Sequence, residues 1–153
     1  MLKVGEKAPD FTLKNTEQED VTLSDFAGKS NVVILFFPLA FTSVCTTELC
    51  TVRDDYSSYE SLDAKVFGIS VDSPFTLAKF KEQESYNFDL LSDFNKEVSS
   101  DYGALFGELM GLKGVSKRSA FVVGKDGKIK YAEVLPSPGD LPDFEAIKAA
   151  LNS

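Results

Sequence analysis

The most apolar stretch of the chain covers residues 31–37, Asn-Val-Val-Ile-Leu-Phe-Phe, and ends at Pro38. A continuous apolar and β-branched run of this length is typical of a central strand that is covered on both faces. After Pro38 the spacing of apolar residues becomes that of an α-helix. Apolar residues then recur at spacings of four, three, four and three, at Cys45, Leu49, Val52, Tyr56 and Tyr59. This stripe predicts an amphipathic helix with one buried face.

Strand and helix patterns alternate along the rest of the chain. Alternating runs at residues 11–13 and 21–23 predict a peripheral N-terminal β-hairpin around a polar turn. Further strands are expected at residues 65–71, 88–91, 119–123 and 129–135, and further helices at residues 74–85, 95–102 and 141–151. The Asp-Gly pair at 126–127 predicts a hairpin turn between the last two strands. Residues 103–114, which contain four glycines, are expected to form a loop.

This order of elements predicts an α/β fold with a central mixed β-sheet and helices on both faces. The length of 153 residues, without repeats or low-complexity segments, fits a single domain, residues 1–153. In sheets of this kind, sites form beyond the carboxyl ends of the strands. A site is therefore expected directly after Phe37, in the region that contains Cys45.

Composition excludes several classes of partner. With 43% hydrophobic and 26% charged residues, the chain has the composition of a soluble globular domain. Its net charge of −8 and its lack of any basic block argue against nucleic acid as a partner. No segment reaches the roughly 18 apolar residues that span a bilayer, so no membrane association is expected. No apolar secretory segment is visible at the N-terminus, so a cytoplasmic location is expected.

Histidine is absent from the chain, which excludes Ser-His-Asp and Cys-His hydrolase chemistry and histidine-based haem and zinc sites. The two cysteines, Cys45 and Cys50, are too few for a disulfide framework or a structural zinc site. We therefore expect no metal and no cofactor. In a reducing compartment, a cysteine pair of this kind indicates redox chemistry rather than structural cross-linking.

Cys45 is expected in the first turn of the helix after Pro38, because Thr42 or Ser43 is a natural N-cap. The backbone N–H groups of a first turn lack intrahelical partners, and the helix dipole favours negative charge there. Both effects stabilise a thiolate. From the spacing alone, Cys45 is equally well explained as a small buried residue at the start of the apolar stripe.

The motif Pro38-xxx-Thr42-xx-Cys45 resembles the active-site motif of the peroxiredoxins, in which the cysteine attacks the O–O bond of a peroxide. Residues 8–13 and 91–93, Ala-Pro-Asp-Phe-Thr-Leu and Leu-Ser-Asp, are also similar to peroxiredoxin landmarks. The resemblance covers essentially the whole chain. It implies a thioredoxin-like fold and a thiol-dependent peroxidase acting on hydrogen peroxide and organic hydroperoxides.

Two subgroups of the family share features with this sequence. The segment Phe-Phe-Pro-Leu-Ala-Phe-Thr at residues 36–42 is most similar to the one-cysteine alkyl hydroperoxide reductase E group. The Cys45-x4-Cys50 spacing instead resembles the bacterioferritin comigratory protein subgroup. The two resemblances differ in what they imply for Cys50.

The resemblance implies a role for each of five residues. Cys45 would be the nucleophile and become a sulfenic acid. Thr42 would donate a hydrogen bond to the peroxide and accept one from it, and Arg118 would stabilise negative charge on the leaving oxygen. Pro38 would exclude water, and Glu48 would orient Arg118 through an ion pair. Without the resemblance, Thr42 is equally a helix cap, Arg118 a solvated residue and Glu48 a first-turn acid that complements the helix dipole.

The sulfenic acid must be reduced, and Cys50 and an external thiol are both candidates. In an intact α-helix, residues five apart are separated by about 7.5 Å of rise and about 140° of rotation. That exceeds the Cα separation of a disulfide, so a Cys45–Cys50 bond requires the first turns to unwind. Thr46 and Thr47 are weak helix formers, which favours unwinding. Otherwise a thioredoxin- or glutaredoxin-like protein or a low-molecular-weight thiol would reduce Cys45.

Two other functions remain open on the sequence. A thioredoxin-type dithiol carrier would suit the architecture, but such proteins normally use Cys-x-x-Cys facing a cis-proline. Here the spacing is longer, and Ser-Lys at 116–117 precedes Arg118 without a proline. A non-catalytic peroxide sensor would form the same sulfenic acid. Only steady turnover of peroxide distinguishes an enzyme from such a sensor.

The resemblance also implies a homodimer through the active-site edge. The candidate apolar patch consists of Leu39, Phe41, Phe106, Leu109 and Met110. These residues are equally well explained as core or loop anchors. No cysteine follows Cys50, so a disulfide between subunits near the C-terminus is not expected.

Overall fold

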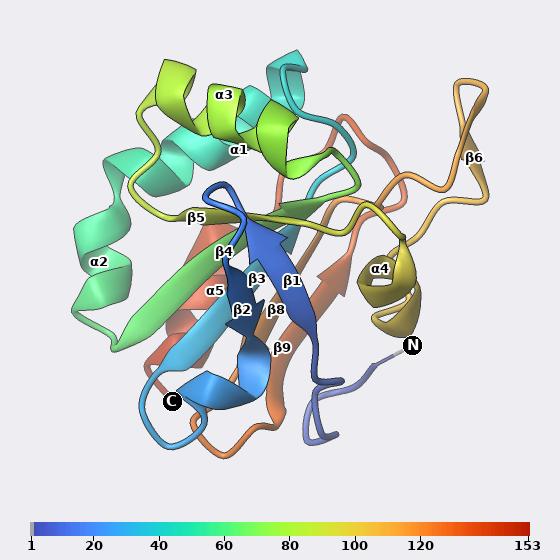
Figure 1. Cartoon of the computed structure of the whole chain (residues 1–153). Coiled ribbons are helices and arrows are strands. Elements are labelled where there is room, and N and C mark those ends of the chain that lie inside the picture. Colours follow the sequence, from blue (N-terminus) through green and yellow to red (C-terminus); the bar gives the residue numbers. More distant parts are fainter. Residues whose placement is uncertain (1) are drawn as a thin grey trace.

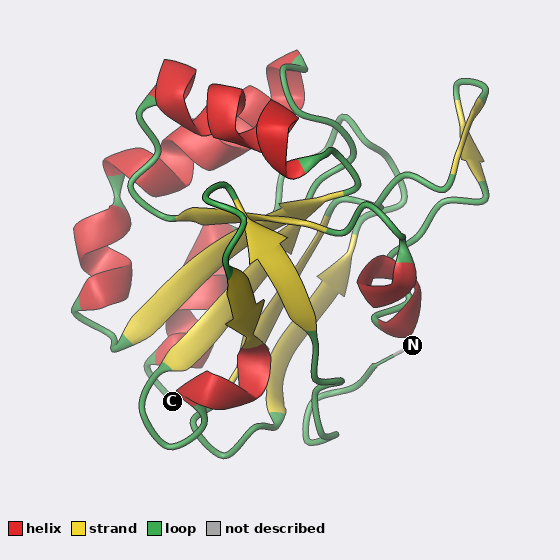
Figure 2. Ribbon diagram, in the orientation of Figure 1, coloured by secondary structure: helices red, strands yellow, loops and turns green. Residues whose placement is uncertain are grey.

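The computed structural model describes residues 2–153, which build a mixed seven-stranded sheet with helices on both faces (Figures 1 and 2). The strand order is β2-β1-β5-β4-β3-β8-β9. Its strands are β1 (Thr12–Asn15), β2 (Asp20–Thr22), β3 (Asn31–Phe36), β4 (Ala64–Ser70), β5 (Asp89–Ser92), β8 (Ser119–Val123) and β9 (Ile129–Val134). The helices are η1 (Leu23–Phe26), α1 (Ser43–Asp54), α2 (Tyr56–Glu60), α3 (Pro74–Glu84), α4 (Glu97–Asp101) and α5 (Phe144–Leu151). The predicted α/β class with a mixed sheet is confirmed.

Strand β3 lies in the interior of the sheet, between β4 and β8, as its apolar sequence predicts, and all six of its residues are buried. It pairs in parallel with β4 and antiparallel with β8, so Ile34 lies opposite both Phe67 and Phe121. Because β8 runs antiparallel, it begins beside the end of β3, with Ser119 opposite Phe36. The residue before β8 is therefore placed at the carboxyl end of β3. That residue is Arg118.

Alternate residues of the central strands face two apolar cores. On one face, Val33 and Leu35 of β3 pack in the core that α1, α2, α3 and α5 cover. On the other face, Ile34 and Phe36 pack in the core formed with η1, α4 and the N-terminal segment. Burying a side chain of this size stabilises the fold by about 1.5–3 kcal/mol. Helix α1 is thereby fixed against the end of β3. None of the helices in residues 2–153 is long and apolar enough to cross a membrane.

The apolar stripe from Cys45 to Tyr59 forms two helices, so the prediction of one continuous helix is wrong. Helices α1 and α2 are separated at Asp55, which leaves helical geometry with a φ of −117°. The carboxylate of Asp55 accepts a hydrogen bond from the hydroxyl of Ser58 at 2.6 Å. Side chains that bond locally in this way compete with helix hydrogen bonds. Tyr59 nevertheless stays in the same core as Cys45.

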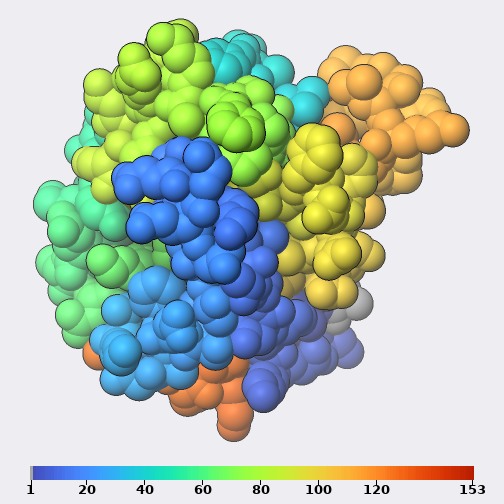
Figure 3. Space-filling model, viewed as in Figure 1, coloured from blue at the N-terminus to red at the C-terminus, as the bar shows by residue number. Residues whose placement is uncertain are grey.

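Residues 103–114 are not wholly a loop, because they contain the small hairpin of β6 (Glu108–Leu109) and β7 (Leu112–Lys113). The hairpin projects from the body of the molecule (Figures 1 and 3). Met110 and Gly111 connect its strands, with φ angles of 51° and 80°. Two positive φ angles give the turn whose twist matches the flanking strands. Glycine suits this conformation but methionine is not a usual turn residue, which explains why the sequence does not predict the hairpin.

Candidate active site

The loop after β3 ends at Thr42, the N-cap of α1, and Cys45 is the third residue of that helix. The first helical hydrogen bond runs from the N–H of Thr46 to the carbonyl of Thr42, at 2.9 Å. The backbone N–H groups of Ser43, Val44 and Cys45 therefore precede the hydrogen-bonded turns. The sulfur of Cys45 lies in the first turn, where the helix dipole favours negative charge.

Thr42 occupies the N-cap position, but its side chain makes no capping hydrogen bond. Its hydroxyl instead donates to the carbonyl of Leu39 at 2.8 Å. A side-chain cap at Thr42, the alternative explanation of this residue, is therefore wrong. Because the hydroxyl hydrogen is engaged within the loop, the expected donation from Thr42 to a peroxide is wrong for this conformation, and Oγ1 is left as a hydrogen-bond acceptor. Thr42 is exposed, so this acceptor is open to a ligand.

Arg118 joins Cys45 and Glu48 in one buried cluster. Nη2 of Arg118 donates to Sγ of Cys45 at 3.2 Å, and Nη1 donates to Oε1 of Glu48 at 2.6 Å. All three residues have exposed fractions of 1% or less. The ion pair expected between Glu48 and Arg118 is present. The alternative of a solvated Arg118 is wrong, because the end of β3 and the first turns of α1 enclose it.

A backbone carbonyl completes the surroundings of the guanidinium. Nε and Nη2 of Arg118 both donate to the carbonyl oxygen of Pro138, at 3.3 and 2.9 Å. Pro138 lies in the loop between β9 and α5. The rigid fork of the guanidinium is thus held by two other segments of the chain, helix α1 and the loop between β9 and α5. Sequence analysis does not identify Pro138, because a carbonyl contact leaves no side-chain pattern.

Burial and ion pairing act in opposite directions on the charges of this cluster. Burial opposes the charge of Arg118, but the carboxylate of Glu48 and the sulfur of Cys45 outweigh it, so the pKa of Arg118 is raised. Burial raises the pKa of Glu48 to about 7, although Arg118 acts to lower it. Oε2 of Glu48 is buried without a hydrogen-bond partner among the described residues. The site therefore holds a fixed cation beside the sulfur and a carboxyl group that titrates near neutral pH.

Cys45 is one of the residues that line a cavity of about 220 Å³. Apolar residues form much of its wall: Pro38, Leu39, Val44, Leu109, Met110 and Pro138. Thr42, Ser43 and Arg118 contribute polar groups. Pro38 is buried and so closes the cavity on one side. A ligand can therefore place a small polar group at the sulfur while its apolar part contacts the wall.

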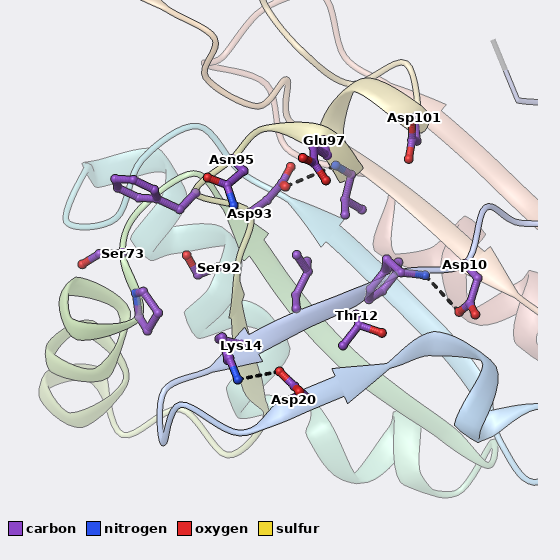
Figure 4. A pocket seen from close by; sticks show the side chains of 15 residues that line it. Asp10, Thr12, Lys14, Asp20, Ser73, Ser92, Asp93, Asn95, Glu97 and Asp101 are labelled. Atoms are coloured by element: carbon purple, nitrogen blue, oxygen red, sulfur yellow. Dashed lines mark hydrogen bonds and ion pairs between the residues drawn. The ribbon is translucent and has the colours of Figure 1, made fainter.

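A wider groove of about 510 Å³ lies elsewhere, between β1, the end of β5 and the start of α4 (Figure 4). None of the predicted site residues lines it. Several carboxylates face it, but within residues 2–153 no group of three or more acidic, cysteine or histidine residues is arranged to hold a metal ion. The carboxylate of Asp93 instead accepts hydrogen bonds from the N–H groups of Val98 and Ser99.

Cys50 lies on α1 outside the cluster. Its Sγ is 3.7 Å from Oε1 of Glu84 and 3.8 Å from the hydroxyl of Tyr86, near the end of α3. Both cysteines are free, and α1 continues without a break from Cys45 to Cys50. The structure thus brings together Cys45, Thr42, Pro38, Glu48 and Arg118 and leaves Cys50 apart.

Comparisons with known proteins agree with one another. Residues 4–132 match the sequence model of the AhpC/TSA family. The chain is 42% identical over 145 residues to alkyl hydroperoxide reductase E of Mycobacterium tuberculosis, covering 94% of this chain and 92% of that protein. It is 43% identical over 132 residues to the putative peroxiredoxin bcp of Haemophilus influenzae, covering 84% and 83%. The crystal structure of peroxidoxin BcpB from Mycobacterium tuberculosis superposes with a TM-score of 0.89 at 30% identity, covering 99% of this chain and 97% of that one.

Proposed function

The chain belongs to the AhpC/TSA family of peroxiredoxins and is a thiol-dependent peroxidase, and on this premise we propose that Cys45 is its nucleophile. One observation carries the proposal. Nη2 of Arg118 lies 3.2 Å from the sulfur of Cys45 inside a cavity that opens to a ligand. A thiolate beside a fixed cation, in the first turn of a helix, is the form of cysteine that attacks peroxides.

In the proposed reaction the thiolate of Cys45 attacks the hydroxyl oxygen of a hydroperoxide. A sulfur–oxygen bond forms as the O–O bond breaks, the sulfur becomes a sulfenic acid, and the leaving alkoxide or hydroxide takes a proton from water. Thr42 accepts the hydrogen bond of the peroxide hydroxyl through Oγ1. The guanidinium of Arg118 and the N–H groups of the first turn stabilise the charge that develops on the leaving oxygen.

Stabilising the thiolate is not enough for a fast peroxidase. A more stable thiolate is also a weaker nucleophile, with a Brønsted slope of about 0.4–0.5 in disulfide exchange. A larger fraction of thiolate is therefore offset by the lower reactivity of each thiolate. Rate enhancement must come from the groups that act on the breaking O–O bond, and Arg118 and Thr42 are the side chains placed to do so.

We propose that both hydrogen peroxide and organic hydroperoxides are substrates. The polar end of the cavity accommodates the hydroperoxide group that all of these molecules share. The apolar wall, which includes Leu39, Leu109 and Met110, would contact an alkyl chain and contribute binding energy that hydrogen peroxide lacks.

The assay that tests the function measures peroxide consumption with an added dithiol reductant. We expect steady turnover by the wild-type protein, since the reductant regenerates Cys45 after each cycle. Cys45→Ser removes the nucleophile and should abolish turnover, while Cys50→Ser keeps the nucleophile and should still consume peroxide. Consumption of only one equivalent of peroxide per protein in the presence of reductant would contradict enzymatic turnover. It would favour a stoichiometric sensor.

Cys50 or an external thiol would reduce the sulfenic acid, and we propose Cys50 as the resolving residue. In the reduced protein α1 separates the two sulfurs, so the first turns must unwind before they can meet. The hydroxyls of Thr46 and Thr47 donate to the carbonyls four residues earlier, at 2.8 and 3.0 Å. Such back-bonding slightly destabilises helices and supports unwinding here.

Intact-mass measurement after one equivalent of peroxide tests this role. Wild-type protein is expected to lose two hydrogens, because condensation of the sulfenic acid with Cys50 releases water and leaves a disulfide. Cys50→Ser should instead gain one oxygen. Loss of two hydrogens by Cys50→Ser would show that Cys50 is not the resolving thiol.

An external reductant closes the cycle in either case. We propose a thioredoxin- or glutaredoxin-like protein or a low-molecular-weight thiol, because each supplies the two electrons that the sulfenic acid or disulfide requires. Recycling of this kind needs a reducing compartment, which supports the proposed cytoplasmic location.

We propose that the protein forms a homodimer through the apolar patch at the active-site edge. Met110 and Phe41 of this patch are 82% and 46% exposed, and the β6–β7 hairpin that carries Met110 projects from the body (Figure 3). Leu109 and Met110 also line the cavity, so a partner seated on the hairpin would narrow the entrance to Cys45. A monomeric molar mass in solution would contradict this proposal.

A further inference from the structure

The loop that carries the active-site motif contains a strained residue. Phe41, directly before Thr42, has a φ of +65°, in the left-handed region that phenylalanine rarely adopts. Such a conformation costs free energy and persists only where the surroundings hold it. The position of the Thr42 hydroxyl therefore depends on whatever fixes the backbone of residues 38–42.

An aromatic contact and a hydrogen bond connect this loop to neighbouring elements. The ring of Phe41 packs against Phe80 of α3, with ring centroids 5.0 Å apart. The N–H of Ala40 donates to Oδ2 of Asp72 at 2.8 Å. Among the described residues, no other side-chain hydrogen bond connects the backbone of residues 38–41 to another element.

We infer that Asp72 is a positioning residue of the peroxidase site, which holds the strained loop so that Oγ1 of Thr42 faces the sulfur of Cys45. The path from Asp72 to the reacting atoms is short. Asp72 fixes Ala40, the neighbouring carbonyl of Leu39 accepts the Thr42 hydroxyl, and that bond orients Oγ1. The inference rests on the proposed roles of Cys45 and Thr42.

Asp72 is itself held rigidly between the ends of two strands. The hydroxyl of Ser70, the last residue of β4, donates to the same Oδ2 at 2.6 Å. The hydroxyl of Ser92, the last residue of β5, donates to the carbonyl of Asp72 at 2.6 Å. Ser92 lies on the wall of the wider groove next to Asp93 (Figure 4). The carboxyl ends of β4 and β5 therefore determine where the loop after β3 lies.

The test uses variants that separate the position of the acceptor from its charge. All are made with Cys50→Ser, so that Cys45 is the one thiol. Asp72→Ala removes the acceptor and should slow oxidation of Cys45 by hydrogen peroxide by about 10- to 100-fold, because small displacements of positioned groups have effects of this size. Asp72→Asn keeps an oxygen at the same distance and should react within about threefold of the parent. Asp72→Glu keeps the charge but moves the oxygen, and should be slowed by about tenfold or more.

Alkylation of Cys45 by iodoacetamide is measured beside oxidation. Alkylation needs an accessible thiolate but no positioned Thr42, so we expect it not to slow in Asp72→Ala. A parallel fall in both rates would indicate general damage to the site and overturn the inference. Unchanged oxidation in both Asp72→Ala and Asp72→Glu would also overturn it. If Asp72→Ala does not fold, the contrast between Asp72→Asn and Asp72→Glu gives the same decision.

Asp10 provides a matched control. Its carboxylate also accepts a hydrogen bond from the backbone of a distant segment, the N–H of Ser24 at 2.9 Å. Asp10→Ala should therefore remove a contact of the same kind without slowing oxidation. The parent protein distinguishes the two proposals. No oxidation of Cys45 in the parent would contradict the proposed function, whereas normal oxidation in both Asp72→Ala and Asp72→Glu would contradict only the role of Asp72.

Discussion

Replacing Arg118 with alanine is expected to slow the reaction of Cys45 with peroxide by about 10²–10³-fold, the usual cost of losing one preorganised donor to developing negative charge. The guanidinium lies 3.2 Å from the sulfur and is already fixed by Glu48 and the carbonyl of Pro138. Its orientation therefore need not change when the O–O bond breaks. Rapid-quench measurement of sulfenic acid formation with hydrogen peroxide and one alkyl hydroperoxide would give the rate constants.

Two further variants show which property of Arg118 accounts for the loss of reaction rate. Arg118→Lys keeps the positive charge, but one ammonium group cannot replace a fork that contacts Glu48, Cys45 and Pro138 together, so we expect a substantial loss here as well. Arg53→Ala removes the same charge from the far end of α1, where Arg53 donates to the carbonyl of Glu84. That control should react within about twofold of wild type. An Arg118→Ala protein as fast as Arg53→Ala would remove Arg118 from the mechanism.

Much of the fold follows from local patterns in the sequence. The apolar run that forms β3 is long and β-branched, and the Asp126-Gly127 turn joins β8 to β9 as expected. These features depend on neighbouring residues alone. The break at Asp55 is different, because it follows from contacts of one carboxylate rather than from apolar spacing. Spacing still places Tyr59 correctly in the core.

In the candidate site too, some residues follow from a local sequence pattern and others do not. Thr42 and Cys45 belong to one contiguous motif, so sequence reasoning places them together at the start of α1. Arg118 is brought to them by the pairing of β8 with β3, which only the resemblance to a family indicates in advance. The Pro138 carbonyl and Asp72 act through backbone groups far away in the sequence. Contacts of that kind depend on the complete fold and leave no local pattern.

Glu48 is expected to make the protein less stable as the pH rises from about 4.5 to about 7. Burial raises the pKa of Glu48 from 4.5 to about 7, so in this range the folded protein binds more protons at Glu48 than the unfolded chain does. The free energy of unfolding then falls with pH, and levels off above the folded pKa. The expected fall from this one group is about 3 kcal/mol, at 1.36 kcal/mol for each unit of pKa.

Urea unfolding of wild type and Glu48→Gln between pH 4 and pH 8 isolates this contribution. Gln keeps an oxygen that can accept from Nη1 of Arg118 but does not titrate, so its stability should lack the fall seen in wild type. Arg118 and Cys45, the other two members of this cluster, are present in both proteins. Their contributions to the pH dependence of stability therefore largely cancel in the difference. Parallel curves for the two proteins would mean that Glu48 is ionised throughout this range. Arg118 would then outweigh burial, and Oε2 of Glu48, which has no hydrogen-bond partner among the described residues, would be part of a buried charged carboxylate.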